Sequence, residues 1–327
     1  MSTIVFFCIP AYGHTNPTLG VVRELAARGH KVVYYSYDTM RKPIEAAGAA
    51  FVSCNAYDAE QRLSPKDGER LGRDLAFSTQ VLVDTTLALD NAILSDMRAL
   101  APDCIVADSM ALWGKLIAKK LDIPFVSSTT TFAFNRYSAK IMKQSPAQLF
   151  GMLVSMPKIG REIKRLQAAG YPVKSVLDII QNDENLDTIV YTSPEFQPCA
   201  DTFPAAHYAF VGPSIRPAEM RMEKSAQPLV YISLGTVVND QLAFYQQCVA
   251  ALADGPCRVI LSIGEQVKPA ALGTLPGNVE VHAHVDQIAV LQIADVFLTH
   301  CGMNSASEAL YFGVPLVMFP QTPEQGG

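Results

Sequence analysis

The sequence predicts an α/β protein with two domains, each built on a parallel sheet. Its 327 residues are about twice the length of an average domain. Hydrophobic residues make up 49% of the chain and charged residues 17%, which is enough apolar material to bury two cores. Short runs rich in β-branched residues alternate with longer helical stretches, a pattern typical of parallel strands joined by crossover helices.

The first run of this alternation occupies residues 1–212, the predicted N-terminal domain. Asn16 is predicted to cap the first helix, with Pro17 at its first position, and Gly29 to end it. Further helices are expected at 39–47 and 110–120, and a mostly helical, irregular stretch at 129–186. Strands are expected at 4–9, 31–35, 50–53, 104–107, 124–127, 189–192 and 208–211.

A proline-rich, charged segment at 213–228 has no periodicity and is predicted to be a linker. The alternation then restarts in a predicted second domain, residues 229–327. Strands are expected at 229–234, 258–262, 279–281, 296–299 and 315–319, and helices at 243–253, 287–292 and 304–312. Because the sequence stops in a loop after a strand, we expect a truncated second domain that exposes Leu316, Val317 and Phe319.

The composition excludes several classes of protein. A net charge of −5 and a pI near 5.7 disfavour electrostatic binding of nucleic acid. Seven cysteines without a CxxC pair indicate reduced thiols. No stretch approaches the roughly 18 apolar residues of a membrane helix, and the apolar N-terminus lacks the basic region of a signal peptide. We therefore expect a cytoplasmic protein.

His14 is the first candidate for catalysis, because it lies between the first predicted strand and the first helix. Ligands of parallel α/β sheets gather at the carboxyl ends of the strands. The positive end of a helix disfavours the imidazolium ion, so His14 could accept a proton as a general base. The alternative is a histidine that only packs and hydrogen-bonds within a turn.

Asp108 follows the predicted strand 104–107 and favours the first interpretation. A doubly wound sheet could bring its carboxylate beside His14. A carboxylate on one ring nitrogen fixes the tautomer and stabilises the imidazolium that forms after proton abstraction. Asp108 could also cap the helix 110–120, and the two roles are compatible.

A glycine-containing turn between a strand and a helix, at residues 299–308, is the second candidate site. Such a turn directs backbone N–H groups and the helix dipole at an anion, although it is neither a Walker loop nor GxGxxG. The loop that contains Thr236, after the first strand of the second domain, adds further amide donors. Alternatively, Ser305 and Glu308 form a capping box, which would give Glu308 a purely structural role.

Taken together, these motifs resemble the family-1 UDP-sugar-dependent glycosyltransferases of the GT-B fold, in particular the bacterial macrolide and flavonoid branch. The resemblance covers nearly the whole chain. The loop GHTNP at 13–17 matches the family's catalytic-histidine loop. The most specific part comprises HAHVDQ at 282–287, THCGMNS at 299–305, EAL at 308–310, GVP at 313–315 and PQTPEQ at 320–325.

The resemblance implies an acceptor-binding N-terminal domain and a donor-binding second domain, both Rossmann-like. It implies an inverting transfer of a hexose from a UDP-sugar, UDP-glucose by expectation, to a hydroxyl of a macrolide, flavonoid or other phenol. No metal and no cofactor are expected. The implied roles are His14 as base with Asp108 as its partner; Val285 and Gln287 on the uracil; Thr236, His300, Gly302, Asn304 and Ser305 on the diphosphate; Glu308 on the ribose; and Glu324 and Gln325 on the sugar.

The sequence departs from the family at three positions. His284 stands where a tryptophan usually stacks on the uracil, Asp286 replaces a proline, and Glu324 replaces an aspartate. Two alternatives stay open: an epimerase of the same fold that needs no acceptor, and a truncated form that binds a nucleotide or hydrophobic ligand without turnover. The aromatic and methionine-rich stretch 132–156 favours an acceptor pocket. The sugar, the acceptor, the regiochemistry and the oligomeric state are not predicted.

Overall fold

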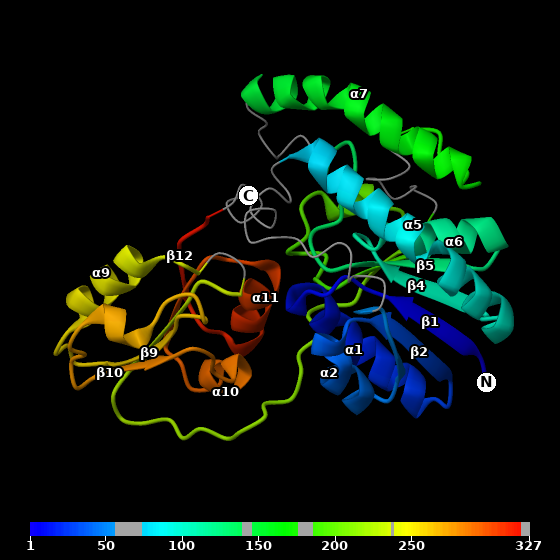
Figure 1. Ribbon diagram of the computed structural model, residues 1–327. Coiled ribbons are helices and arrows are strands. Elements are labelled where there is room, and N and C mark those ends of the chain that lie inside the picture. Colours follow the sequence, from blue (N-terminus) through cyan, green and yellow to red (C-terminus); the bar gives the residue numbers. More distant parts are fainter. Residues whose placement is uncertain (56–73, 139–145, 176–185, 237–238, 322–327) are drawn as a thin grey trace. The chain divides into compact units, whose positions relative to one another are not determined.

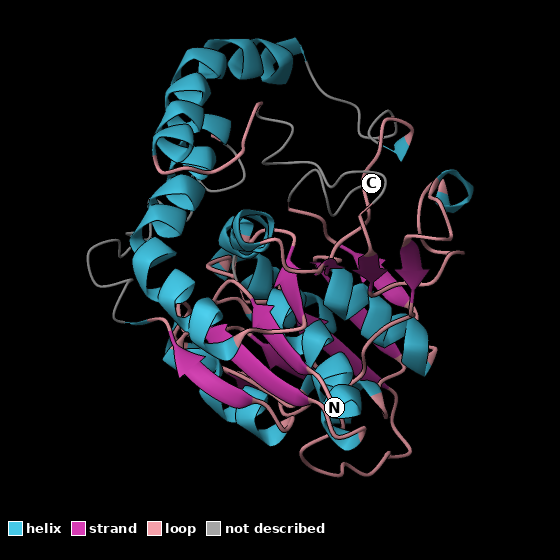
Figure 2. Cartoon of the chain, turned by 90° about the vertical axis from the view of Figure 1, so that its right-hand side faces the viewer, coloured by secondary structure: helices cyan, strands magenta, loops and turns pink. Residues whose placement is uncertain are grey.

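The computed structural model describes residues 1–55, 74–138, 146–175, 186–236 and 239–321. The chain divides into two compact units, Met1–Ser214 and Ile215–Gly327. Each unit contains one parallel sheet with helices packed on it, so the predicted α/β class with two parallel sheets is confirmed (Figures 1 and 2).

The first unit is built on a seven-stranded sheet with the order β3-β2-β1-β4-β5-β6-β7, in which all neighbours are parallel. The order reverses between β1 and β4, which opens a crevice at the carboxyl ends of these two strands. The strands are β1 (Thr3–Phe7), β2 (Lys31–Ser36), β3 (Ala50–Ser53), β4 (Cys104–Asp108), β5 (Phe125–Thr129), β6 (Thr188–Val190) and β7 (Tyr208–Phe210).

Helices cover both faces of this sheet because successive residues of the strands point to opposite sides. Phe6 packs with Leu19 in one apolar cluster, and Phe7 packs with Trp113 in another. The first face carries α1 (Tyr12–Ala27), η1 (Asp38–Met40) and α2 (Arg41–Ala46). The second carries α5 (Leu75–Leu100), α6 (Leu112–Leu121) and α7 (Pro146–Ala168), as Figure 1 shows; a short helix, η3 (Ala200–Thr202), precedes β7.

The second unit has a five-stranded parallel sheet with the order β10-β9-β8-β11-β12 and a reversal between β8 and β11. Its strands are β8 (Leu229–Ser233), β9 (Arg258–Ser262), β10 (Val279–His282), β11 (Val296–Thr299) and β12 (Leu316–Met318). α9 (Leu242–Leu252) and η4 (Pro269–Leu272) pack on one face, and α10 (Gln287–Leu291) and α11 (Met303–Phe312) on the other. On the edge strand β12, Val317 is exposed and Leu316 is half-buried. Phe319, directly after this strand, is exposed as well, although its ring stacks on Phe244 at 4.3 Å between ring centroids.

The predicted start of the first helix is wrong. α1 begins at Tyr12, and the carbonyl of Ala11 accepts the N–H groups of His14 and Thr15. Pro17 therefore lies inside the helix. A proline near the start of a helix removes a single backbone hydrogen bond, which does not stop the helix from beginning earlier. His14 consequently belongs to the first turn of α1.

Residues 215–228 form no helix or strand, and two ion pairs fasten them to the second unit. Arg216 Nη2 lies 2.6 Å from Asp286 Oδ1, and Lys224 Nζ lies 2.6 Å from Asp295 Oδ1. Most of the segment expected to be a linker is therefore anchored to the fold that follows it. Within the described ranges, no helix is long and apolar enough to cross a membrane.

Candidate active site

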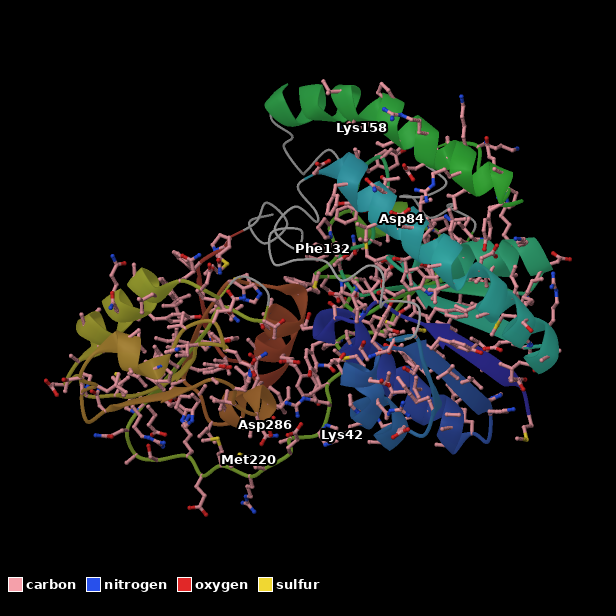
Figure 3. All side chains as sticks on the ribbon, in the orientation of Figure 1. Lys42, Asp84, Phe132, Lys158, Met220 and Asp286 are labelled. Carbon is pink, nitrogen blue, oxygen red and sulfur yellow. The ribbon has the colours of Figure 1, made fainter. Side chains whose placement is uncertain are left out.

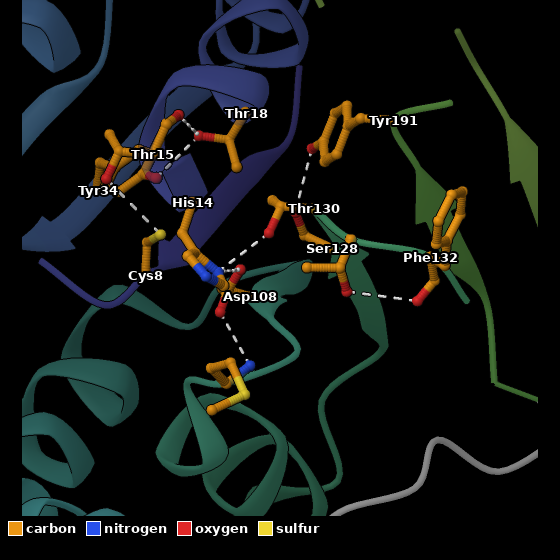
Figure 4. A network of polar contacts seen from close by, with 12 residues as sticks. Cys8, His14, Thr15, Thr18, Tyr34, Asp108, Ser128, Thr130, Phe132 and Tyr191 are labelled. Atoms are coloured by element: carbon orange, nitrogen blue, oxygen red, sulfur yellow. Dashed lines mark hydrogen bonds and ion pairs between the residues drawn. The ribbon is translucent and has the colours of Figure 1, made fainter. Parts of the chain in front are cut away.

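His14 and Asp108 meet at the crevice of the first sheet. α1, which carries His14, follows β1, and Asp108 is the last residue of the adjacent strand β4. His14 Nδ1 lies 2.8 Å from Asp108 Oδ2, with the aspartate side chain fully buried and the histidine side chain 21% exposed (Figure 4). The structure thus brings together the two residues that the sequence singled out for catalysis.

The carboxylate of Asp108 is held at both oxygens, because the backbone N–H of Met110 donates to Oδ1 at 2.8 Å. The cap of α6 is Ala111, so Asp108 closes the preceding turn and does not cap the helix as the alternative assumed. A carboxylate only accepts hydrogen bonds, so Nδ1 of His14 must carry the ring proton. In that tautomer Nε2 is the nitrogen that can accept a proton.

A third residue of this site, Thr130, was missed by the sequence analysis. Its Oγ1 lies 3.0 Å from the same Nδ1 of His14, and the residue is 3% exposed. The available signal was a run of hydroxyl residues, Ser-Ser-Thr-Thr-Thr at 127–131, at the carboxyl end of β5.

In the second unit, Gln287 joins three polar side chains at the start of α10. Its Nε2 donates to Glu308 Oε2 at 2.6 Å and to Ser305 Oγ at 3.3 Å. Its Oε1 accepts from the hydroxyl of Tyr231 at 3.1 Å, a contact that no motif indicated. Burial raises the pKa of Glu308, although the Gln287 hydrogen bond and the charge of Arg216 act in the opposite direction.

The capping-box alternative for Ser305 and Glu308 is wrong. α11 has Gly302 as its cap, so Ser305 is the third helical residue and Glu308 lies a full turn further along. Gly302 has no side chain with which to cap this helix terminus. The Glu308 carboxylate points to Gln287, which belongs to another helix. Glu308 is thus part of a polar cluster and does not close the N-terminus of α11.

His300 lies in a narrow space between two glycines at the reversal of the second sheet. A Cβ atom on Gly235 would come within 2.5 Å of the His300 ring, and one on Gly302 within 2.4 Å. Gly235 also has φ +78°, a conformation that disfavours side chains. Burial lowers the pKa of His300, against an opposing hydrogen bond that the ring donates to the Ser233 backbone, so a neutral ring is favoured at pH 7.

The remaining residues predicted to bind the nucleotide sugar are dispersed over the same part of the sequence. Asn304 is the second residue of α11, Thr236 is exposed after β8, and Val285 is half-buried against the cluster that includes α10 and α11. Glu324 and Gln325 lie outside the described residues. In the described part of the chain, no group of three or more His, Cys, Asp or Glu residues is arranged to hold a metal ion.

Two of the residues that depart from the family pattern have different environments. The His284 side chain is 63% exposed and lies 3.5 Å from Glu265. The Asp286 side chain is 5% exposed and accepts from Arg216 and from the backbone N–H groups of Glu219 and Met220. Asp286 and Met220 are labelled in Figure 3. Burial alone would raise the pKa of Asp286, but these three donors outweigh it and lower the value. The aspartate is therefore an anchor for the segment 215–228.

Comparisons with solved structures define the class of protein as a GT-B glycosyltransferase. The glycosyltransferase of kitacinnamycin is 29% identical, with a TM-score of 0.81 over 99% of this chain and 81% of that one. The calicheamicin glycosyltransferase is 30% identical, with a TM-score of 0.75 over 97% of this chain and 79% of that one.

Sequence comparisons narrow the class to a family. The profile described as UDP-glucoronosyl and UDP-glucosyl transferase matches residues 207–326. The uncharacterized UDP-glucosyltransferase YojK of Bacillus subtilis is 32% identical over 99% of this chain and 81% of its own length. Demethyllactenocin mycarosyltransferase of Streptomyces fradiae is 33% identical over 99% of this chain and 72% of its own length. The chain belongs to this family of UDP-glycosyltransferases, enzymes whose substrate is a nucleotide sugar, as the motifs indicated.

Proposed function

We propose that the enzyme transfers a hexose from a UDP-sugar to a hydroxyl of a small hydrophobic acceptor, with inversion at the anomeric carbon. His14 Nε2 takes the proton of the acceptor hydroxyl as its oxygen attacks, and the UDP group leaves from the opposite face. The observation that carries this proposal is the 2.8 Å contact between His14 and the buried carboxylate of Asp108. That carboxylate stabilises the imidazolium formed in the reaction.

The donor is assigned to the second unit. Its Gln287 and Val285 would contact the uracil, and Glu308 the two ribose hydroxyls, since a carboxylate accepts from a vicinal diol. The α11 terminus would hold the diphosphate through backbone N–H groups, because its cap residue, Gly302, has no side chain that could occupy them. The other residues in these roles would be Thr236, His300, Gly302, Asn304 and Ser305 on the diphosphate, and Glu324 and Gln325 on the sugar.

An apolar, hydroxyl-bearing acceptor fits the first unit. Phe132 and Phe196 lie with their ring centroids 5.4 Å apart, beyond the carboxyl ends of β5 and β6, and Phe134 is 43% exposed nearby in the chain. The Met110 side chain is also 43% exposed, and the backbone N–H of Met110 donates to Asp108. Two relatives are named for macrolides, the mycarosyltransferase described above and the oleandomycin glycosyltransferase of Streptomyces antibioticus.

The test is release of UDP from UDP-glucose with and without a phenolic acceptor, together with detection of the glycoside. We expect acceptor-dependent turnover that His14→Ala lowers by about 10²–10⁴-fold, with UDP affinity unchanged. The matched control is His207→Ala, which removes another histidine–aspartate pair, 2.9 Å from Asp187 at the amino ends of β7 and β6. Full turnover by His14→Ala would overturn the assignment of the base, and UDP-sugar conversion without acceptor would indicate an epimerase.

A further inference from the structure

Thr130 contacts the same nitrogen of His14 that Asp108 binds. Its Oγ1 lies 3.0 Å from Nδ1, beside Asp108 Oδ2 at 2.8 Å (Figure 4). Thr130 is 3% exposed, so solvent does not compete for this contact. The ring therefore has two oxygen partners at one nitrogen, one charged and one neutral.

The sheet fixes the position of Thr130. In the register of β4 and β5, Asp108 lies opposite Ser128, and the N–H of Ser109 donates to the Ser128 carbonyl at 2.9 Å. Thr130 follows two residues later, directly after the end of β5. The adjacent strands β1, β4 and β5 thus deliver the base, its carboxylate and the hydroxyl to one point, and none of the three depends on a long loop.

The protonation of His14 Nδ1 determines which atom donates in the hydrogen bond with Thr130. Nδ1 carries one proton, and Asp108 can only accept it. Thr130 Oγ1 therefore accepts a hydrogen bond from the same Nδ1–H, which makes the hydrogen bond bifurcated. Two acceptors on one N–H restrict rotation of the ring about its Cβ–Cγ bond and so define where Nε2 points. When Nε2 gains the acceptor's proton, Nδ1–H becomes a stronger donor and both oxygens bind it more strongly.

We propose that Thr130 is a positioning residue for the reaction, whose hydroxyl orients the His14 ring and stabilises the imidazolium formed during transfer. The proposal rests on the proposed role of His14 as the general base. Thr130 acts through His14, whose ring nitrogen its hydroxyl contacts.

The test compares three variants in the acceptor-dependent assay. Thr130→Val keeps the shape and removes the hydroxyl, and we expect kcat to fall about tenfold, equal to about 1.4 kcal/mol of barrier, with the KM of both substrates unchanged. Thr130→Ser should restore most of the rate. The control is Thr129→Val, since Thr129 Oγ1 is buried without a hydrogen-bond partner in the described structure, and this variant should retain full activity.

A change of acceptor separates positioning of a base from general support of the fold. A nitrophenol ionises more easily than a simple phenol and needs less help from a base, so the loss in Thr130→Val should shrink with it. Wild-type kcat in Thr130→Val, an equal loss for both acceptors, or failure of serine to rescue would each overturn the proposal. If His14→Ala itself is active, the proposed base has failed; if His14→Ala is inactive and Thr130→Val is normal, only the positioning role has failed.

Discussion

Glu308 gives the sharpest test of the donor site, because its substitution should lower the affinity for UDP without lowering the stability of the fold. The variant is Glu308→Gln, which preserves the size of the side chain and one oxygen that can accept from Gln287, 2.6 Å away in the unmodified protein. If the carboxylate binds the ribose, UDP affinity must fall. If the carboxylate only supports α11, stability must fall with affinity intact.

The loss of affinity follows from the change in hydrogen-bond type. Hydrogen bonds to a charged group contribute about 1.5–3 kcal/mol, against about 0.5–1.5 kcal/mol for neutral pairs. Two ribose hydroxyls that lose a charged acceptor would therefore cost about 2–3 kcal/mol in total. The dissociation constant of UDP should rise roughly 30- to 150-fold.

Stability should change in the other direction. Burial raises the pKa of Glu308, so the folded protein keeps this proton to a higher pH than the unfolded chain does. The free energy of unfolding consequently falls as the pH rises from the ordinary glutamate range through the raised value, because the unfolded state is then the one that releases the proton. Glu308→Gln has no such proton to lose, and its Tm at neutral pH should equal or exceed that of the unmodified protein.

The assay is calorimetric titration of UDP and of thymidine diphosphate, which lacks the ribose 2′-hydroxyl, together with thermal unfolding between pH 4 and 7. The variant should lose more affinity for UDP than for thymidine diphosphate. Glu280→Gln, at an exposed glutamate on β10 in the same unit, is the control and should change neither quantity. Unchanged UDP affinity combined with a lower Tm would refute the ribose assignment.

Three further variants test other parts of the structure. Asp108→Asn should reduce kcat less than His14→Ala does, because the ring remains but loses its fixed tautomer; a larger loss, measured in the same assay, would contradict His14 as the base. Gly235→Ala should weaken UDP binding by displacing the His300 ring. Gly313 also has positive φ, but no described atom lies within 4 Å of an added methyl group, so Gly313→Ala should cost only about 1–2 kcal/mol of stability. Asp286→Ala should lower the free energy of unfolding by about 3 kcal/mol, since it leaves Arg216 and two backbone N–H groups without their acceptor; urea denaturation would measure this, and no change would contradict the anchoring role.

The sequence predicted the contact between His14 and Asp108 because the order of strands in a parallel sheet determines which strand ends are neighbours. A strand followed by a polar residue, repeated in a parallel sheet, brings such residues to one edge, and this rule placed Asp108 beside His14. The same rule does not distinguish functional hydroxyl residues from others, because hydroxyl residues occur at many strand ends for local reasons. Thr130 therefore carried no distinguishing signal, although it follows β5 in the same way as Asp108 ends β4.

Other differences have local physical causes. α5 spans Leu75–Leu100, a stretch for which no element was predicted. It packs on α6 and α7 and shares an apolar cluster with the sheet. The capping box failed because the spacing of Ser305 and Glu308 is also the spacing of one helical turn, which any helix interior satisfies. Asp286 was noted as a departure from the family, but its partner Arg216 is 70 residues away and could only be found in the fold.

The five apolar clusters of the described residues each draw their members from one unit alone. A substitution near the ends of β4 and β5 therefore leaves the interior packing of the second unit untouched, and the reverse also holds. Selection can accordingly alter the residues that we propose to contact an acceptor, such as Met110, Phe132 and Phe134, without repacking the interior of the unit to which we assign the nucleotide. Acceptor preference can therefore diverge within one lineage while the apolar cores of the second unit stay unchanged.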